Sequence, residues 1–495
     1  MIRATLQGPR GRVGLAAALT GLLLGTGCGG DSSSGPDYGS IEEIRYSEHV
    51  QPIFNATCNS AACHNGVDRA AGLALTSYDA VAEGSDIGAQ VVPYFADRSH
   101  LWLHTTGAIE PQMPLARDPL DQQVIDFLRR WIDEGAVDDA GFPMYSDVTR
   151  KAFVACQGEN TVAVVDMDTG LTVRHLEVDQ PHAVYVDPVS RRLYVSRFEN
   201  ASDNIWVYNA DTYERIRTGR AGTFPALMTV VRPAGQPAQL WVTNFDANTS
   251  TGDHAVRVLD PVTLAETWSY TSPSGIQPHG IAVSADQSRV YICNIASGTV
   301  SIFGTDTDPP NIPDGPVTMP AAGAAHQPQQ CVLSADENYL FVGALGVDKI
   351  YVLDLTGPSA AFLPASTVDV GNGPWNMTIA PGGSELWVAN WLESSVSVVD
   401  VSNPVAPFVK ATLSPPNPVD AERQTLQRPI GISFSPDGSR VYVTSANDDG
   451  SGSGHHPPPG GEKAPGNVAV FDASTYQVLH VAEVPNFARF VSFLP

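Results

Sequence analysis

The chain has 495 residues, too many for one compact core, so we expect several domains or a large repeat architecture. A hydrophobic content of 43% and a mean hydropathy of -0.07 are typical of a soluble globular protein. The 53 acidic and 28 basic residues give a net charge of -25 at pH 7. Such a surface repels polyanions, so nucleic acid is excluded as an expected partner.

The first expected element is a signal peptide over residues 1–28, with three arginines, an apolar run at 13–24 and small residues before Cys28. It resembles a bacterial lipoprotein signal, which implies that Cys28 carries lipid and that residues 29–41 form a flexible linker. Gly25 stands where such signals usually carry Leu, so plain secretion stays open. An uncleaved anchor also stays open, although the apolar run is short for a membrane span.

A short amphipathic helix is expected next, because Val50, Ile53 and Phe54 recur at helical spacing. This helix would end at Cys58. Haem attachment in c-type cytochromes usually has two residues between two cysteines, followed by His. Here four residues separate Cys58 from Cys63, and His64 follows at once.

The helical region closes with a second amphipathic helix, preceded by an isolated Met-Pro pair at Met113. Asp118 and Pro119 are the expected cap and first-turn residues of this helix, and Gly135 is expected to end it. Apolar side chains on one helical face would pack into the core of the region.

These motifs, in this order, resemble single-haem c-type cytochrome domains, and we assign residues 42–140 to a small all-α domain of that kind. The resemblance implies one covalent haem c, with thioether links at Cys58 and Cys63. It further implies that His64 is the proximal iron ligand and Met113 the distal one. A thioether ligand raises the reduction potential, which favours electron transfer over oxygen chemistry.

The residues alone leave other readings open. The two thiols could form a disulfide beside a solvent-facing His64. A zinc site would need a second pair of ligands at suitable spacing, and none stands nearby. His100 or His104 could compete with the methionine for the distal position.

After a hinge at 141–150, residues 151–495 repeat a pattern of paired strands with Asn, Gly, Ser and Asp at the turns. Most pairs follow a short strand introduced by Pro, which predicts four-stranded blades. The pattern, including "LYVSR", "LWVTN" and "VYVTS", resembles the seven-bladed YVTN propellers. We expect the C-terminal strand at 488–494 to join blade 1 and close the ring, because the first strand pair has no inner strand before it.

Three further cysteines, Cys156, Cys293 and Cys331, fall in strand-like segments. We expect buried thiols without partners at these positions. A bridge between Cys293 and Cys331 is the alternative, since the compartment would be oxidising.

Several propeller histidines begin inner strands or occupy turns on one face of the ring. They could hold a metal or a second haem at that rim, or serve structural and docking roles. A cytochrome c domain before a propeller also resembles the arrangement of haem-d-type nitrite reductases. The rim histidines are His182, His254, His279, His326, His455 and His456.

The predicted function is that of an extracytoplasmic bacterial electron-transfer protein, periplasmic or on the cell surface and lipid-anchored to the outer membrane. Redox proteins would be its electron donor and acceptor, and the propeller would bind a partner or substrate. One alternative is an oxidoreductase with a catalytic rim site. The other is a propeller binding protein whose haem is structural or sensory.

Overall fold

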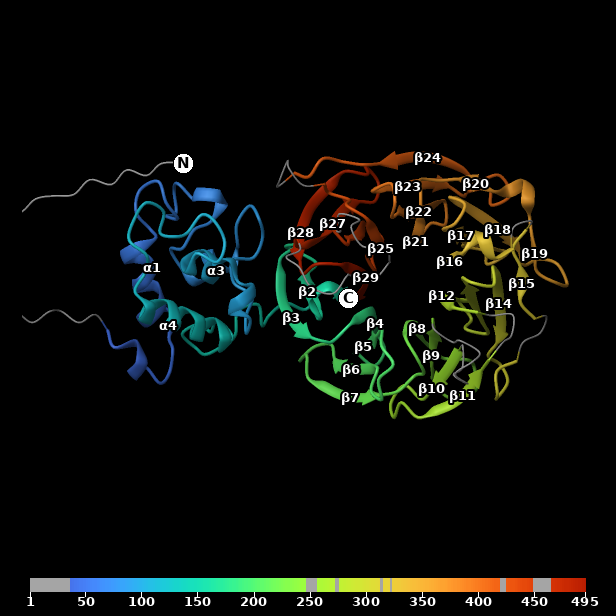
Figure 1. The fold of residues 1–495 in the computed structure, drawn as a ribbon, viewed down its shortest axis with the longest axis horizontal. Coiled ribbons are helices and arrows are strands. Elements are labelled where there is room, and N and C mark those ends of the chain that lie inside the picture. The colour runs from blue at the N-terminus through green and yellow to red at the C-terminus, as the bar shows by residue number, and fades with distance from the viewer. Residues whose placement is uncertain are drawn as a thin grey trace, which may run out of the picture. The chain divides into compact units, whose positions relative to one another are not determined.

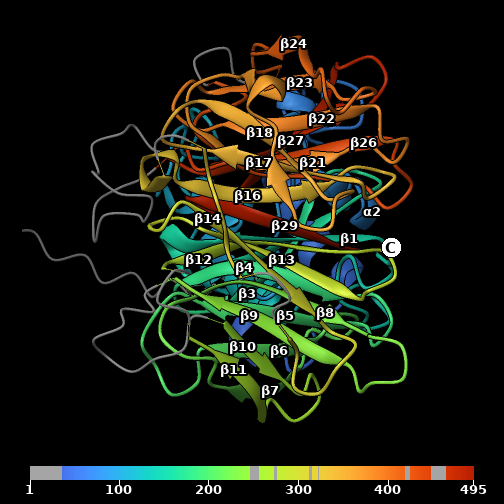
Figure 2. The same cartoon turned by 90° about the vertical axis from the view of Figure 1, so that its right-hand side faces the viewer.

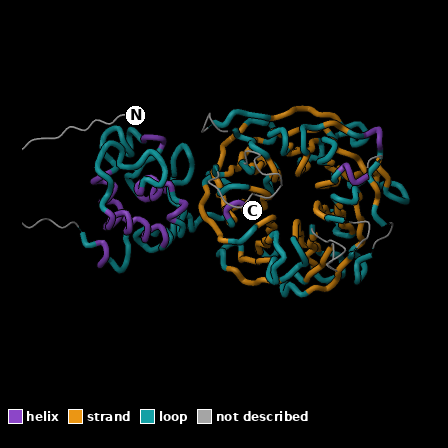
Figure 3. Tube along the Cα trace, viewed as in Figure 1, coloured by secondary structure: helices purple, strands orange, loops and turns teal. Residues whose placement is uncertain are grey.

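The computed structural model describes residues 36–245, 256–271, 276–311, 315–320, 323–418, 424–447 and 464–495. By its contacts the chain divides into two compact units, Met1–Glu42 and Glu43–Pro495. The described end of the first unit contains the 3-10 turn η1 (Tyr38–Ser40). The second unit contains a small helical domain and then a seven-bladed all-β propeller (Figures 1 and 3), which confirms the expected fold class. Within the described ranges, every helix is too short or too polar to cross a membrane.

The helical domain packs around three aromatic rings, two from its first helices and one from its last. The Tyr46 ring lies 6.4 Å from that of Phe54 and 5.7 Å from that of Trp131, measured between centroids, and all three side chains are buried. The helices are the π-helix η2 (Tyr46–Val50), α1 (Gln51–Thr57), η3 (Ala70–Gly72), α2 (Tyr78–Ala82), η4 (Ala96–Arg98), α3 (His100–Thr106) and α4 (Gln122–Asp133).

The start of α4 differs from the expected one. The cap is Asp121 and not Asp118, because the Asp121 carbonyl accepts the first helical hydrogen bonds, from the N–H groups of Val124 (2.9 Å) and Ile125 (3.1 Å). At the other end, Gly135 has a φ of 105°, a conformation that a residue with a Cβ rarely adopts. The helix therefore starts later than expected and stops where expected.

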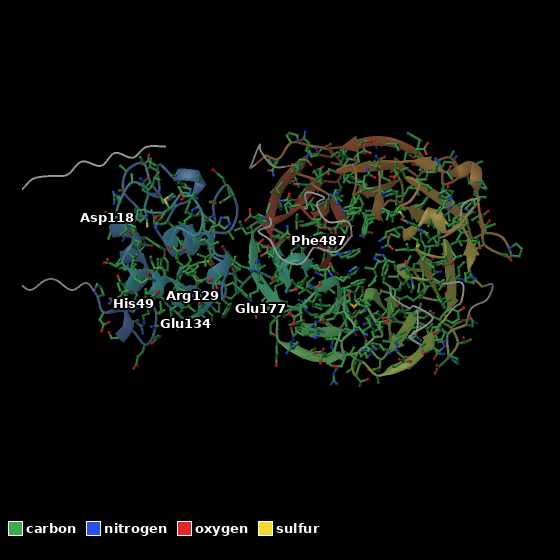
Figure 4. All side chains as sticks on the ribbon, in the orientation of Figure 1. His49, Asp118, Arg129, Glu134, Glu177 and Phe487 are labelled. Carbon is green, nitrogen blue, oxygen red and sulfur yellow. The ribbon has the colours of Figure 1, made fainter. Side chains whose placement is uncertain are left out.

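Ionic contacts hold α4 against the neighbouring segment. Arg129, labelled in Figure 4, donates to both carboxylate oxygens of Asp97, at 2.9 and 2.8 Å. The Asp133 carboxylate in turn accepts the N–H of Ala96 at 3.0 Å. Such exposed ion pairs contribute about 0–1 kcal/mol each to stability. They therefore mainly orient the helix, and the packing of the buried rings supplies most of its stabilisation.

Seven antiparallel sheets form the blades of the propeller (Figure 1). Blade 1 contains β29 (Ala488–Leu494), β1 (Lys151–Cys156), β2 (Thr161–Asp166) and β3 (Thr172–Glu177). Blade 2 contains β4 (Pro181–Asp187), β5 (Arg192–Arg197), β6 (Ile205–Asn209) and β7 (Arg215–Gly219). Blade 3 contains β8 (Pro225–Val231), β9 (Gln239–Asn244), β10 (Val256–Leu259) and β11 (Glu266–Tyr270).

The remaining blades follow the same order. Blade 4 contains β12 (Pro278–Val283), β13 (Arg289–Asn294), β14 (Thr299–Gly304) and β15 (Val317–Thr318). Blade 5 contains β16 (Pro328–Leu333), β17 (Tyr339–Ala344), β18 (Lys349–Asp354) and β19 (Ala361–Phe362), with β20 (Val368–Asp369) also on β18. Blade 6 contains β21 (Pro374–Ile379), β22 (Glu385–Asn390), β23 (Ser395–Asp400) and β24 (Phe408–Leu413). Blade 7 contains β25 (Pro429–Phe434), β26 (Arg440–Ser445), β27 (Gly466–Asp472) and β28 (Val478–Val484). Short 3-10 turns are η5 (Gln157–Glu159), η6 (Gly323–His326) and η7 (Pro364–Ser366).

The ring closes through the two ends of the propeller sequence. Strand β29 pairs antiparallel with β1, with Leu494 opposite Lys151 and Val491 opposite Val154. It therefore supplies the innermost strand of blade 1, next to the inner strands β4 and β25 of the neighbouring blades, as the turned view in Figure 2 shows for β4. Closure removes the unpaired sheet edges that an open array would expose.

The chain makes the same sharp turn before each inner strand. The residue ahead of the strand has a positive φ in every blade, for example 47° at Gln180 and 59° at Phe487 (labelled in Figure 4). The second residue of each inner strand is then buried, with 0–2% of its surface exposed. These residues are Arg489, His182, Ala226, His279, Gln329, Trp375 and Ile430 in blades 1 to 7.

The three strand cysteines are buried thiols without disulfide partners. Cys293 and Cys331 belong to one core cluster between blades 4 and 5. Burial, together with the neighbouring Cys331 thiol, raises the pKa of Cys293 well above its usual value. At neutral pH the Cys293 thiol is therefore protonated and unreactive.

The helical domain contacts blade 1 through side chains of β3. The Arg174 guanidinium lies 3.6 Å from the centre of the Tyr94 ring, and the His175 ring meets the Phe95 ring at 5.7 Å between centroids. An ion pair between Arg98 and Glu159 joins the same two parts of the chain. Burial, with smaller effects from both arginines, lowers the pKa of His175 to about 3.

We predict that Gly431→Ala destabilises the propeller. A Cβ on Gly431 would overlap the carbonyl oxygen of Arg489 on the adjacent inner strand. Overpacking of this kind costs about 2 kcal/mol of unfolding free energy, measurable by urea denaturation. Gly382→Ala is the matched control, because no atom lies within 4 Å of its added Cβ. Equal stability of the two variants would contradict the tight seam between blades 7 and 1.

We also predict a pH-dependent contribution from His175. In the folded state its pKa is about 3, against an ordinary value of 6.5, so only the unfolded chain takes up a proton as the pH falls below 6.5. Stability is therefore complete above pH 6.5 and decreases towards pH 3. Between pH 6.5 and 4.5 the wild type should lose about 2 kcal/mol more than His175→Leu. Parallel stability curves for the two proteins would refute the burial of a neutral imidazole.

Candidate functional site

The loop after α1 carries the two cysteines and the histidine of the motif. Cys58 caps α1 by donating its N–H to the Phe54 carbonyl (2.8 Å). The chain then turns back, and the N–H of His64 donates to the Cys58 carbonyl at 3.1 Å. This bond closes the loop at its base, so the four residues between the cysteines form a bulge and His64 stays beside the end of the helix.

Both thiols of the loop are half-buried and neither forms a disulfide. The Cys58 sulfur lies 3.3 Å from the hydroxyl of Thr57, and Ser60 donates its hydroxyl to the Cys63 sulfur at 3.3 Å. Burial raises the pKa of Cys58, the Cys63 thiol adds to this, and Thr57 and Arg117 act against it. The two sulfurs are thus held as separate thiols, and burial favours the protonated form of Cys58.

The imidazole of His64 is half-buried and favours its neutral form. Burial lowers its pKa, nearby His104 lowers it further, and the backbone of Leu73 and Ala70 acts in the opposite direction. The Nδ1 atom is buried without a partner at hydrogen-bonding geometry. Neutral imidazole is the form that binds a metal.

Met113 is half-buried in a loop that is tied to the same region. Its N–H donates to the His104 carbonyl at 2.9 Å, and the His104 Nδ1 bonds to the Pro111 carbonyl at 2.9 Å. Farther along this loop, Arg117 donates to the hydroxyl of Ser60 at 2.9 Å. The structure therefore connects the segment of Met113 to the cysteine loop.

The competing histidines are not equivalent. His100 is hydrogen-bonded to Glu483 of β28, with 3.1 Å between its Nε2 and the carboxylate, so it is oriented toward the propeller. His104 keeps its Nε2 available because Nδ1 is bonded to Pro111. His104 is therefore the rival to Met113 that the structure leaves.

These observations fit a haem better than a disulfide or a zinc ion. Two separate thiols, a neutral imidazole with a buried nitrogen and a nearby thioether are the groups that c-type attachment requires. Over the described ranges, no group of three His, Cys, Asp or Glu side chains could hold a metal ion by itself.

The propeller rim is only partly described. The rings of His182 and His279 meet at 5.6 Å between centroids, and both pack against Phe490 at 5.8 and 6.2 Å. His326 instead bonds through Nε2 to the Tyr351 hydroxyl at 2.9 Å. The structure thus brings two of the expected rim histidines together and directs a third to another partner. His254, His455, His456 and the expected lipidation site Cys28 lie outside the described residues.

Sequence reasoning missed Arg489 and Gln329, which occupy the inner-strand position of His182 and His279. A usable signal was present, because this position is one residue after the proline of most inner strands. Sequence reasoning did not include His175 among the rim histidines, and the structure buries it with both ring nitrogens lacking hydrogen-bond partners. Its ring packs against Phe95 of the helical domain, so no local pattern could identify it.

Two families match parts of the chain. Residues 61–114 match Planctomycete cytochrome C, and residues 255–451 match Lactonase, 7-bladed beta-propeller. The first segment includes Cys63, His64 and Met113. No curated protein matches the chain.

Solved propellers share the fold at low sequence identity. The periplasmic gluconolactonase PpgL of Pseudomonas aeruginosa is 16% identical with a TM-score of 0.53, covering 70% of this chain and 99% of that one. A protein from Lactobacillus plantarum is also 16% identical, with a TM-score of 0.52 and the same coverage. At this identity the likeness shows the fold alone. The chain therefore joins a cytochrome c-like domain, which implies a haem, to a seven-bladed propeller of the lactonase type.

Proposed function

We propose that the protein is an extracytoplasmic c-type cytochrome that carries single electrons through one covalent haem. Cys58 and Cys63 would form the thioether links, and His64 and Met113 would be the axial ligands. The propeller would then offer a platform for a partner or substrate. The observation that carries this proposal is the loop of two separate thiols, closed by the bond between His64 N–H and the Cys58 carbonyl.

When bound, the haem would supply a one-electron iron couple. The residues of the chain would set its properties. The half-buried His64, whose lowered pKa favours the neutral form, offers a lone pair without first losing a proton, and the thioether of Met113 would favour the reduced iron. The bond between Arg117 and Ser60 would restrain both sides of the site.

The location follows from the amino terminus. Thiols with this role need an extracytoplasmic compartment for haem attachment, and residues 1–28 carry the signal that would deliver the chain there. Cys28 would bear the lipid and tether the protein to the outer membrane. The net charge of -25 would favour a redox partner with a basic surface at low ionic strength.

We predict that Met113→Ala removes the weak near-infrared band that sulfur ligation gives to ferric haem. The absorption spectrum of full-length protein, matured with haem-attachment machinery, tests this before and after reduction. His104→Ala is the matched comparison and should keep the band, because its ring would not bind iron. If Met113→Ala leaves the spectrum unchanged while His104→Ala alters it, the distal ligand is His104.

Mass spectrometry and metal analysis test the attachment itself. Mature protein should gain the mass of one haem and contain one iron per chain. Cys58→Ser and Cys63→Ser should each keep a single thioether link, and the double variant should lose covalent haem. A sulfur–sulfur link without added haem would refute the proposal. More than one iron, or copper, would instead favour a second site at the propeller rim.

A further inference from the structure

A cavity of about 180 Å³ lies where the hinge at 141–150, the helical domain and blades 1 and 2 meet. Lys151 of β1 and Arg174 of β3 contribute basic side chains to its wall. Much of the remaining wall is apolar, with Pro93, Pro143, Val148 and Val173.

The Arg174 guanidinium lies against aromatic rings and has no carboxylate beside it. Its central carbon is 3.6 Å from the centre of the Tyr94 ring and 5.7 Å from that of the Tyr213 ring. Over the part of the chain that the structure describes, this side chain forms no hydrogen bond or ion pair. Burial lowers its pKa, and the two tyrosines act in the opposite direction. A partly buried charge without an anionic partner is costly, so an anion at this point would be stabilising.

The N–H groups of Arg174 are placed to receive that anion. The Nε atom is buried without a partner. The two terminal nitrogens also lack a partner within the described ranges, but they do not count among the buried atoms, so they are accessible from the cavity that Arg174 lines. The Tyr94 ring covers one side of the guanidinium and restrains it. A guanidinium restrained in this way presents a fork of N–H groups that matches the two oxygens of a carboxylate.

Lys151 adds a second positive charge to the cavity. It is 4% exposed, and its Nζ donates to the carbonyls of Ala210 and Asp211, at 3.4 and 3.1 Å. Asp211 alone is acidic among the described lining residues, and its carboxylate accepts two hydrogen bonds from Arg191, at 2.8 and 2.6 Å. The cavity therefore has an excess of positive charge in a protein with a net charge of -25, which attracts anions to it.

The size and the apolar wall of the cavity narrow the class of anion. An apolar cavity of about 150 Å³ holds benzene, so the volume here accommodates a carboxylate on one small apolar body. Inorganic phosphate would leave water against Pro93, Pro143 and Val173. An apolar body would instead remove this surface from water, which is favourable.

We propose that this cavity binds a small organic monocarboxylate, whose carboxylate accepts hydrogen bonds from Arg174 and whose apolar body packs against the prolines of the wall. This binding goes beyond the proposed electron transfer and does not require haem. The hinge, the helical domain and the propeller all contribute to the wall, so the bound molecule would contact all three.

Calorimetric titration of the full-length protein with benzoate, benzamide and inorganic phosphate tests the proposal. Benzoate should bind most tightly, because benzamide has nearly the same shape without the charge and phosphate has the charge without the apolar body. Arg174→Gln should weaken benzoate binding about tenfold or more, the effect of losing a hydrogen bond to a charged group. Arg217→Gln is the matched control and should bind as the wild type does, because Arg217 is an exposed arginine of β7 outside the cavity.

A second variant decides the matter if Arg174→Gln does not fold. Ser146 is exposed and lines the cavity, so Ser146→Trp should fill the space from the surface and abolish binding. Three outcomes would overturn the proposal: no binding of benzoate, binding of benzamide or phosphate as tight as that of benzoate, or benzoate binding that neither substitution weakens. The double variant Cys58→Ser/Cys63→Ser should still bind benzoate, so failure of haem attachment and failure of this proposal are distinguishable.

Discussion

The antiparallel pairing of β29 with β1 is the constraint on which the propeller depends. Through it, the last strand of the chain becomes the inner strand of the first blade, and all seven inner strands acquire neighbours on both sides. Contacts between inner strands are close enough that Gly431 has no room for a Cβ beside Arg489. The pairing also fixes β3 as the outer strand of blade 1, which presents Arg174 and His175 to the helical domain.

The candidate haem site depends on a constraint of a different kind, the local hydrogen bonds of one loop. The His64 N–H reaches the Cys58 carbonyl, and Ala62 adopts a φ of 61° within the bulge. Four residues between the cysteines are therefore compatible with a histidine held close to the helix end. The wide spacing changes the outer part of the loop and leaves its base closed.

Much of this architecture was predictable because blades and amphipathic helices leave periodic patterns in the sequence. Strand pairs led by Pro identified the blades, and the spacing of Val50, Ile53 and Phe54 identified α1. The start of α4 was missed because two aspartates, Asp118 and Asp121, are both good caps, and only the backbone decides between them. The contacts of the rim histidines were harder to predict than the helix boundaries. His326 lies two residues ahead of an inner strand, at the end of η6, and bonds to Tyr351, a contact set by packing between residues distant in the sequence.

Side chains of the inner strands also join blades that are not neighbours in the ring, since the rings of His182 in blade 2 and His279 in blade 4 meet at 5.6 Å. Phe490 from blade 1 meets His182 from blade 2 and His279 from blade 4, so aromatic rings from three blades converge there. A substitution at any of these three rings would therefore disturb blades that do not follow one another along the chain, so the inner strands behave as one packed unit and not as seven independent blades.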